Sequence, residues 1–214
     1  MEHSHQQLDT LKDIKQMMER SSRFISLSGL SGIAAGICGL VSAWFASDIF
    51  YKAGSSPFGS YPIQEPRGFG LDILFNSRLF WIAIITFIVA FILAVVFTYS
   101  RSKKNNSPIW SVTSRRVLFA VAIPMLAGVF FVYKLLAYGT YDLVIGGCLL
   151  FYGLALINGS KFTLSEVRYL GYGQLFLGII SLFYPGYGLY FWAVGFGLLH
   201  IIYGSIMWWK YERK

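Results

Sequence analysis

The sequence is poor in charged residues, and acidic residues are the scarcest. Charged side chains make up 13% of the 214 residues, about half the share usual in soluble domains. Asp and Glu number 10 against 18 Lys and Arg, so the net charge is +8. Because 56% of the residues are hydrophobic, a soluble fold of this size would have too few charges to cover its surface. The composition excludes a disordered chain and a soluble nucleic-acid-binding protein, and it predicts an integral membrane protein.

Cysteine and catalytic motifs are lacking as well. The two cysteines, Cys38 and Cys148, both fall in apolar runs, which excludes a disulfide-rich module. The sequence has no zinc-protease, serine-hydrolase or phosphate-loop motif. His3 and His5 have no further metal ligands beside them. We therefore predict no enzymatic activity, no metal site and no cofactor.

Long uncharged runs are abundant instead. A bilayer crossing needs about 20 mostly apolar residues. The last two runs come from one stretch that a turn signal at Tyr184-Pro185-Gly186 divides. The predicted fold is all-α, a polytopic membrane domain over 23–214 with six transmembrane helices in three hairpins. Its spans are expected at about 24–47, 79–100, 117–138, 143–160, 169–184 and 189–209.

The basic residues predict the orientation of these spans. With six spans, both termini share one side of the membrane, and fourteen of the 18 Lys and Arg residues fall on that side. The other four lie opposite: Lys52, Arg67, Arg78 and Lys134. Because loops rich in Lys and Arg remain in the cytoplasm, we expect both termini to be cytoplasmic. The basic excess then meets anionic lipid head groups, and no nucleic-acid partner is expected.

Residues 1–22, before the first span, have the pattern of an amphipathic helix. Lys15 interrupts the apolar stripe, whereas Asp9, Lys12 and Asp13 lie off it. We expect a cytoplasmic helix that lies on the bilayer or pairs with a protein partner. The stripe consists of Leu8, Leu11, Ile14 and Met18.

A few polar residues within the predicted spans are candidates for function. His200 falls near the middle of the last span, with Tyr203 on the same helical face. It could relay protons with Tyr203 or a neighbouring helix as its partner, or it could be a neutral imidazole bonded to a carbonyl or a tyrosine between helices. Gln174, between Gly171 and Gly178, is an interhelical hydrogen-bonding group or part of a substrate site. The candidate intramembrane site is therefore His200, Gln174 and Tyr203.

Other positions carry predictions about charge and packing. Lys134 and Asp142 flank the same outer turn and form a candidate charge pair. Pro124 leaves the Ala120 carbonyl without its usual helical partner and favours a kink. A stripe of small residues in the first span predicts close packing against another helix of the same chain, with the same span of a second copy of the chain as the alternative partner. The stripe consists of Gly29, Gly32, Gly36 and Gly39.

Spans three and four also share a pattern with spans five and six. Gly146 maps to Gly197 at an offset of 197 − 146 = 51, and Tyr152-Gly153 maps to Tyr203-Gly204 at the same offset. Successive hairpins of the same orientation would be parallel repeats. The pattern predicts a helical-hairpin repeat.

One stretch resembles known sequences: Met18-Glu19-Arg20-Ser21-Ser22-Arg23-Phe24 followed by Ser26-Leu27-Ser28-Gly29-Leu30-Ser31-Gly32. It resembles the start of uncharacterised bacterial multi-pass membrane proteins. The three-hairpin plan also resembles small six-helix proteins of the acid-resistance membrane type. These resemblances carry no catalytic motif, and what they imply is a bacterial inner membrane.

Two functions of different classes fit the sequence. The first is a non-enzymatic membrane protein that acts through protein contacts, as a scaffold, sensor or assembly factor. The alternative is a small-solute or proton transporter or channel built from helical-hairpin repeats, with His200 and Gln174 in its path.

Overall fold

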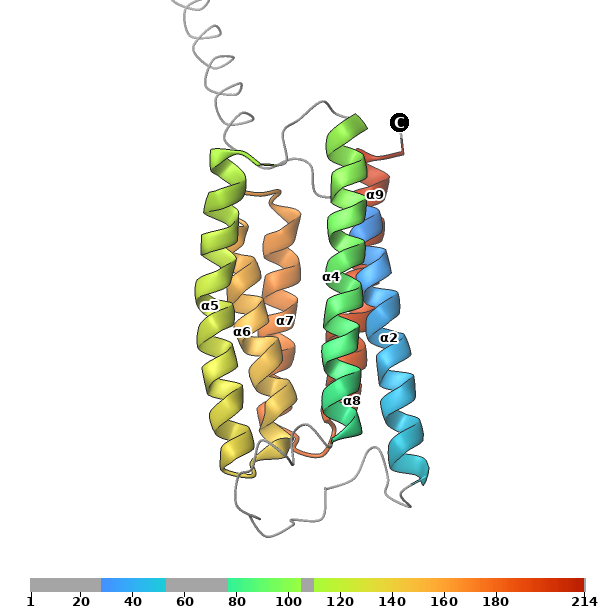
Figure 1. Ribbon diagram of the computed structural model, residues 1–214, viewed down its shortest axis with the longest axis vertical. Helices are drawn as coiled ribbons and strands as arrows, with labels where there is room; N and C mark the ends of the chain where they lie inside the picture. Colours follow the sequence, from blue (N-terminus) through green and yellow to red (C-terminus); the bar gives the residue numbers. More distant parts are fainter. Residues whose placement is uncertain (1–27, 53–76, 105–109, 214) are drawn as a thin grey trace, which may run out of the picture.

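The computed structural model describes residues 28–52, 77–104 and 110–213, and within these ranges every regular element is helical (Figure 1). The longer helices are α2 (Gly29–Lys52), α4 (Arg78–Lys104), α5 (Val112–Ala137), α6 (Val144–Gly159), α7 (Glu166–Phe183) and α9 (His200–Tyr211). A 3-10 turn, η1 (Tyr141–Leu143), precedes α6, and α8 (Gly188–Trp192) continues through a π-helical segment, η2 (Ala193–Leu199), into α9. The predicted amphipathic helix at 1–22 lies outside the described residues.

The helices have the length and composition of membrane spans. Five stretches qualify clearly, namely Gly29–Ile49, Arg78–Lys104, Val112–Ala137, Tyr141–Gly159 and Gly188–Tyr211. The remaining long helix is α7, which has 18 residues and carries Glu166 and Arg168 in its first turn. The predicted all-α class is confirmed, with five or six helices apolar enough to cross a bilayer.

Local chemistry explains where two helices depart from the uncharged runs. Helix α5 begins before the run because Ser111 caps it: Ser114 N–H donates to Ser111 Oγ at 3.1 Å, and Ser111 N–H donates to Ser114 Oγ at 3.4 Å. Helix α2 continues past Asp48, where Lys52 Nζ donates to Asp48 Oδ2 at 2.6 Å across one turn. A serine cap therefore extends α5, and an ion pair extends α2, beyond their apolar parts.

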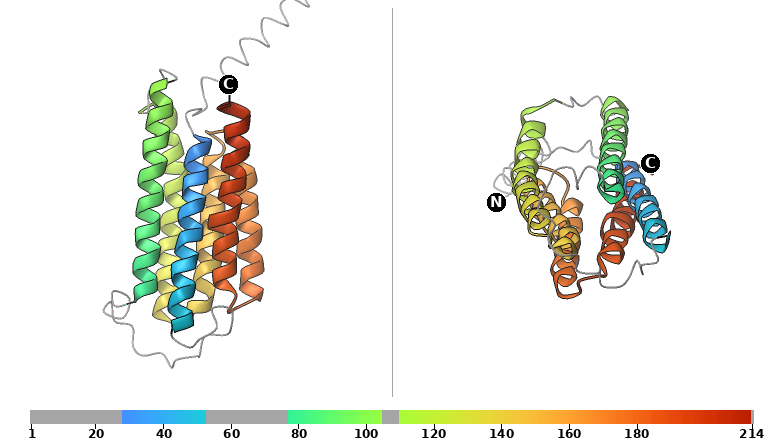
Figure 2. Two further views of the ribbon diagram at one scale, coloured as in Figure 1. Left: turned by 90° about the vertical axis from the view of Figure 1, so that its right-hand side faces the viewer. Right: turned by 60° about the horizontal axis from the view of Figure 1, so that its bottom comes forward.

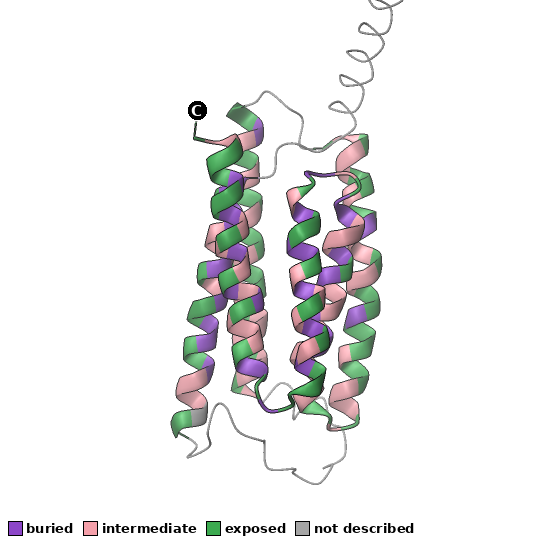
Figure 3. Ribbon diagram, turned by 180° about the vertical axis from the view of Figure 1, so that it is seen from behind, coloured by how far each residue is buried: buried purple, intermediate pink, exposed green. Residues whose placement is uncertain are grey.

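The long helices form two layers of three (Figures 1 and 2). In one layer α6 packs between α5 and α7, and in the other α2 packs between α4 and the η2–α9 segment. The layers meet where η2 and α9 approach α7 and where α8 approaches α6. Burial is concentrated along the contacts within and between the layers (Figure 3). No residue in the most apolar stretch of α4 is buried.

The charges divide between the two ends of the bundle. Helix α2 begins, and α9 ends, at the same end (Figure 1). We call this the basic end, because it holds Arg101, Lys103, Lys104, Arg115, Arg116, Lys161, Arg168, Lys210 and Arg213. The described basic residues at the far end are Lys52, Arg78 and Lys134.

Two sequence features have a clear structural consequence in these layers. The Ala120 carbonyl, left free by Pro124, accepts a hydrogen bond from Asn158 Nδ2 of α6 at 2.8 Å, so the neighbouring helix replaces the lost backbone bond. The glycine stripe of α2 faces η2 and α9: a Cβ on Gly32 would lie 3.0 Å from Gly204 Cα, and one on Gly36 would lie 2.7 Å from the Gly197 carbonyl oxygen. The backbones approach because neither helix has a side chain there.

The hairpin repeat stays a prediction that the packing does not confirm. Helices α5 and α6 pack along each other, but α7 packs mainly on α6 and α9 mainly on α2. The turn between α7 and α8 occurs where it was expected, with Gly186 at φ 93°, a conformation that favours glycine.

Candidate functional site

Three polar side chains from three helices meet between the layers. Tyr152 comes from α6, Gln174 from α7, and His200 is the first residue of α9 after the π-helical segment. His200 is 6% exposed and Gln174 is fully buried. We call Tyr152, Gln174, His200 and the Gly195 carbonyl the polar cluster.

Hydrogen bonds connect every member of the polar cluster. Tyr152 Oη lies 2.8 Å from His200 Nε2, and His200 Nδ1 lies 3.0 Å from the Gly195 carbonyl oxygen. Gln174 Nε2 donates to the same oxygen at 2.7 Å. Because a carbonyl oxygen can only accept, we assign the hydrogen of a neutral His200 to Nδ1, which leaves Nε2 to accept from the Tyr152 hydroxyl.

The π-helical segment makes the Gly195 carbonyl available to these side chains. A π turn is wider than an α turn, and such turns are frequent at functional sites. His200 follows Gly195 by five residues, so its ring reaches back across one π turn to this carbonyl. A Cβ on Gly195 would lie 2.5 Å from Leu149 Cδ2 and 2.9 Å from Gln174 Oε1, so a larger residue here would displace the Leu149 and Gln174 side chains.

Aromatic rings surround the cluster and join the layers. The Tyr152 and His200 rings stack with their centroids 5.5 Å apart, and Phe196 packs against Tyr152 at 5.4 Å. Trp192 packs against Phe196 at 4.6 Å and donates from Nε1 to Ser42 Oγ of α2 at 2.9 Å. Residues of α2, α6 and η2 therefore hold His200 in one orientation.

The structure brings together two of the three predicted intramembrane residues. His200 and Gln174 share the Gly195 carbonyl, but the hydroxyl partner of His200 is Tyr152, not the predicted Tyr203. Tyr203 Oη is buried and has no hydrogen-bond partner among the described residues. A carbonyl or a tyrosine bonded between helices was among the alternatives for His200, but the sequence did not identify Tyr152 as that tyrosine. The signal was present, since Tyr152 occupies the position that maps to Tyr203 at the 51-residue offset.

The predicted outer pair is not formed. Lys134 Nζ lies 5.9 Å from the ring centroid of Tyr138, in a cation–π arrangement. Asp142 Oδ1 is buried and unpartnered within the described residues. The described ion pairs are Asp48–Lys52, Arg101–Glu212 and Glu166–Lys210. Lys134 has its own aromatic neighbour, so no charge pair guards this turn.

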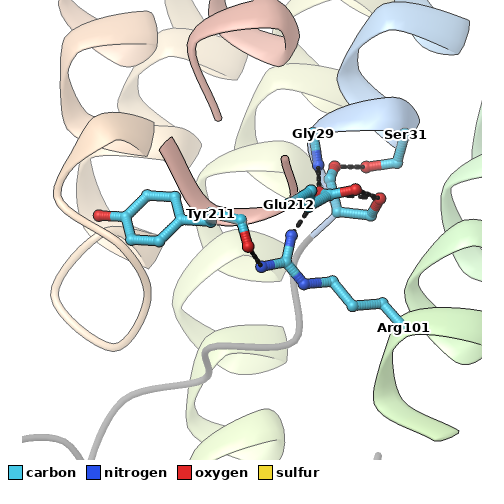
Figure 4. Close-up of polar contacts among 6 residues, drawn as sticks. Gly29, Ser31, Arg101, Tyr211 and Glu212 are labelled. Atoms are coloured by element: carbon cyan, nitrogen blue, oxygen red, sulfur yellow. Dashed lines mark hydrogen bonds and ion pairs between the residues drawn. The ribbon is translucent and has the colours of Figure 1, made fainter. Parts of the chain in front are cut away.

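Glu212 joins three helices at the basic end (Figure 4). Its carboxylate pairs with Arg101 of α4 and accepts from the Gly29 N–H at the start of α2. Ser28 Oγ donates to it at 3.2 Å, and Arg101 also donates to the Tyr211 carbonyl at 3.4 Å. This carboxylate satisfies a free N–H at the start of α2, so the contact fixes how α2, α4 and α9 meet.

Glu166 makes a second contact of this kind, between α7 and α9. Its Oε1 accepts from Lys210 Nζ and, at 2.9 Å, from Tyr211 Oη. Burial alone would raise the pKa of this carboxyl, but the hydrogen bonds from Lys210 and Tyr211 outweigh burial and hold the pKa below its ordinary value. Glu166 is therefore ionised at neutral pH.

The described residues contain no group of three His, Cys, Asp or Glu side chains placed to bind a metal ion. The polar cluster can bind or exchange protons and can hydrogen-bond a small polar molecule. It has no nucleophile paired with a general base. Comparisons with protein-family models, with curated proteins and with solved structures found no match to this chain.

Proposed function

We propose that this chain is a non-enzymatic integral membrane protein of six spans, with both termini cytoplasmic, that transports protons or a small polar solute. The observation that carries the proposal is the polar cluster, which lies at the contact between the two layers and beside a break in regular α-helix. Transporters place their sites near the bilayer midplane, between repeats and at discontinuous helices. The resemblance of residues 18–32 supports a bacterial inner membrane as the location.

The contact pattern of the layers supports this proposal. The first three long helices are α2, α4 and α5, and the last three are α6, α7 and α9. Matched in order, α2 corresponds to α6, α4 to α7 and α5 to α9. The packing contact of α2 with α4 then corresponds to that of α6 with α7, and the contact of α2 with α9 corresponds to that of α6 with α5. The matched helices run in opposite directions (Figure 1). This is the pattern of an inverted repeat in which the third helices are exchanged between the layers.

The chemistry of the cluster fits a site that changes state. In neutral His200, Nε2 accepts from Tyr152. Protonation of Nε2 would turn it into a donor, and the Tyr152 hydroxyl would then have to accept and find a new partner for its hydrogen. Because Tyr152 and His200 belong to different layers, a proton at this position changes the contact between the layers.

The proposal is tested by proton flux into liposomes that contain the purified protein. We expect an imposed pH gradient to dissipate faster with the wild type than with His200→Gln, because glutamine cannot titrate. Gln64→Ala, outside the described residues, is the matched control for loss of a polar side chain and should behave as the wild type. Equal dissipation by wild type, His200→Gln and empty liposomes would reject proton transport.

A second candidate is the scaffold, sensor or assembly factor that works through protein contacts. The uncovered apolar length of α4, together with the closed packing around Gln174, favours it. Such a protein would carry no flux and would lose partner binding when α4 is altered. The double variant Phe87→Leu with Phe91→Leu, which changes two exposed residues of α4, distinguishes a transporter from a scaffold. Proton flux depends on His200 and should be unchanged, whereas partner binding by a scaffold depends on α4 and should be lost.

A further inference from the structure

We infer that protons reach His200 from the basic end, along the seam between α7 and α9 and by way of Glu166 and Tyr203. This inference rests on the proposed function and adds a direction of entry to it. Three side-chain oxygens of α7 and α9 are buried without a hydrogen-bond partner among the described residues: Glu166 Oε2, Tyr203 Oη and Gln174 Oε1. Buried polar atoms are almost always satisfied, so three on these two helices call for an explanation.

Glu166 stands at the entrance to this seam. Its Oε1 is held by Lys210 and Tyr211 of α9, while Oε2 is buried and has no described partner. The side chain of Glu166 is 12% exposed, and that of its partner Lys210 is 57% exposed. Oε1 is therefore held beside the exposed ammonium group of Lys210, and Oε2 is free to exchange a proton with groups inside the bundle.

Tyr203 lies between this entrance and the polar cluster. On α9, Tyr203 follows His200 by three residues, and Tyr211 follows Tyr203 by eight. The three side chains therefore share a helical face that extends about 16 Å along the axis. The Tyr203 hydroxyl is buried on this face and has no hydrogen-bond partner among the described residues. It is thus placed to hand a proton from one group to the other.

Ordered water is the natural link between these atoms. Buried waters in proteins bond to polar atoms that have no other partner, with about three hydrogen bonds each. A phenol donates and accepts at once, and a carboxylate accepts, so waters bound to Glu166, Tyr203 and Tyr152 make a continuous series of proton donors and acceptors.

The transfer is a relay in which atoms balance. A hydronium ion at the basic end gives its proton to the series and becomes water. Tyr152 gives its hydroxyl proton to His200 Nε2 and takes a proton from the water beside it, so the net change is one proton added to His200. The charged and titratable groups beside the path are Lys210, Tyr211, Arg101 and Tyr152, from α9, α4 and α6.

The experiment measures exchange of the ring C2 hydrogen of His200 with deuterium, by mass spectrometry of the full-length protein in lipid nanodiscs. The peptide that contains His200 is separate from His3 and His5, and the measurement needs no transport. We expect exchange in the wild type, slowed about tenfold in Tyr203→Phe and in Glu166→Gln, because each loses one hydrogen-bonding member of the series. Tyr203→Phe keeps the ring and removes only the unpartnered hydroxyl, so its folding is the safer of the two.

Two controls separate the path from general loosening. Tyr169→Phe alters a 72% exposed tyrosine of α7, and Tyr172→Phe alters a 50% exposed tyrosine of the same helix. Both should exchange as the wild type. Equal exchange in wild type and Tyr203→Phe, or slowing in Tyr172→Phe alone, would overturn the inference. The expected exchange pattern in a protein that carries no proton flux would support the path and reject transport.

Discussion

His200 is fixed in one chemical state by its neighbours. The Gly195 carbonyl requires a hydrogen on Nδ1, and the Tyr152 hydroxyl supplies one to Nε2. Gln174 donates to the same carbonyl, so the two side chains share one acceptor. The polarity of His200 and Gln174 could be read from the sequence, but their meeting at Gly195 depends on a π-helical segment that has no signal in the residue pattern.

Removal of the Tyr152 hydroxyl tests this assignment. In Tyr152→Phe, the buried Nε2 of His200 loses its donor, and we expect a loss of about 1–3 kcal/mol in the free energy of unfolding. Thermal unfolding in detergent measures it. Tyr172→Phe alters a 50% exposed tyrosine on α7 and should cost less. Equal stability of the two variants would mean that the hydroxyl does not bond to His200.

Glu166 predicts how stability depends on pH. Its pKa is lowered in the folded protein from the ordinary value of 4.5. A lowered carboxyl pKa stabilises the fold fully above the unfolded value, and this contribution is lost as the pH falls through the folded value. We therefore expect the melting temperature to fall with acidification below about pH 4.5, and to fall less steeply in Glu166→Gln. An identical acid response in both would contradict the assignment.

At the scale of elements, the glycine stripe of α2 determines how the layer around α2 packs. The stripe was visible in the sequence as small residues every third or fourth position, and the structure identifies its partner as η2 and α9. The partner could not be chosen beforehand, because α6 and α7 also carry glycines at helical spacing. Those glycines pack against each other, with a Cβ on Gly153 2.9 Å from the Gly171 carbonyl oxygen.

A bulky residue in this stripe should separate the helices. In Gly36→Leu the new side chain would begin 2.7 Å from the Gly197 carbonyl oxygen, and we expect a loss of about 3 kcal/mol or more in stability. Ala34→Leu adds similar bulk about 200° around the helix and is the matched control. Equal melting temperatures of the Gly36→Leu and Ala34→Leu variants in detergent would show that Gly36 does not contact η2 and α9.

At the scale of the whole molecule, composition was the strongest predictor. The scarcity of charge predicted long apolar helices, and the structure contains them. The uncharged runs predicted the ends of these helices to within a few residues. The arrangement of those helices was not predictable from local pattern. The expected hairpin repeat paired helices that follow each other in sequence, whereas glycine contacts pair α9 with α2, the last long helix with the first.

The distribution of basic residues predicts the orientation of this arrangement. We expect a membrane-impermeant thiol reagent, added outside cells, to label Tyr138→Cys at the far end and to spare Lys161→Cys at the basic end. Both positions are exposed, and Cys38 and Cys148 are replaced by alanine in the background. The reverse labelling pattern would place the basic end outside and overturn the topology.

The most direct test of the account is the distance between the two layers as a function of pH. Spin labels at Tyr99→Cys on α4 and Leu118→Cys on α5, both exposed and on opposite layers, report that distance by pulsed electron resonance in nanodiscs. Because a proton on His200 should change the contact between the layers, we expect the distance distribution to shift between neutral and acidic pH. We expect no shift in the His200→Gln variant. A distribution that is the same at both pH values, or that shifts equally with His200→Gln, would contradict it.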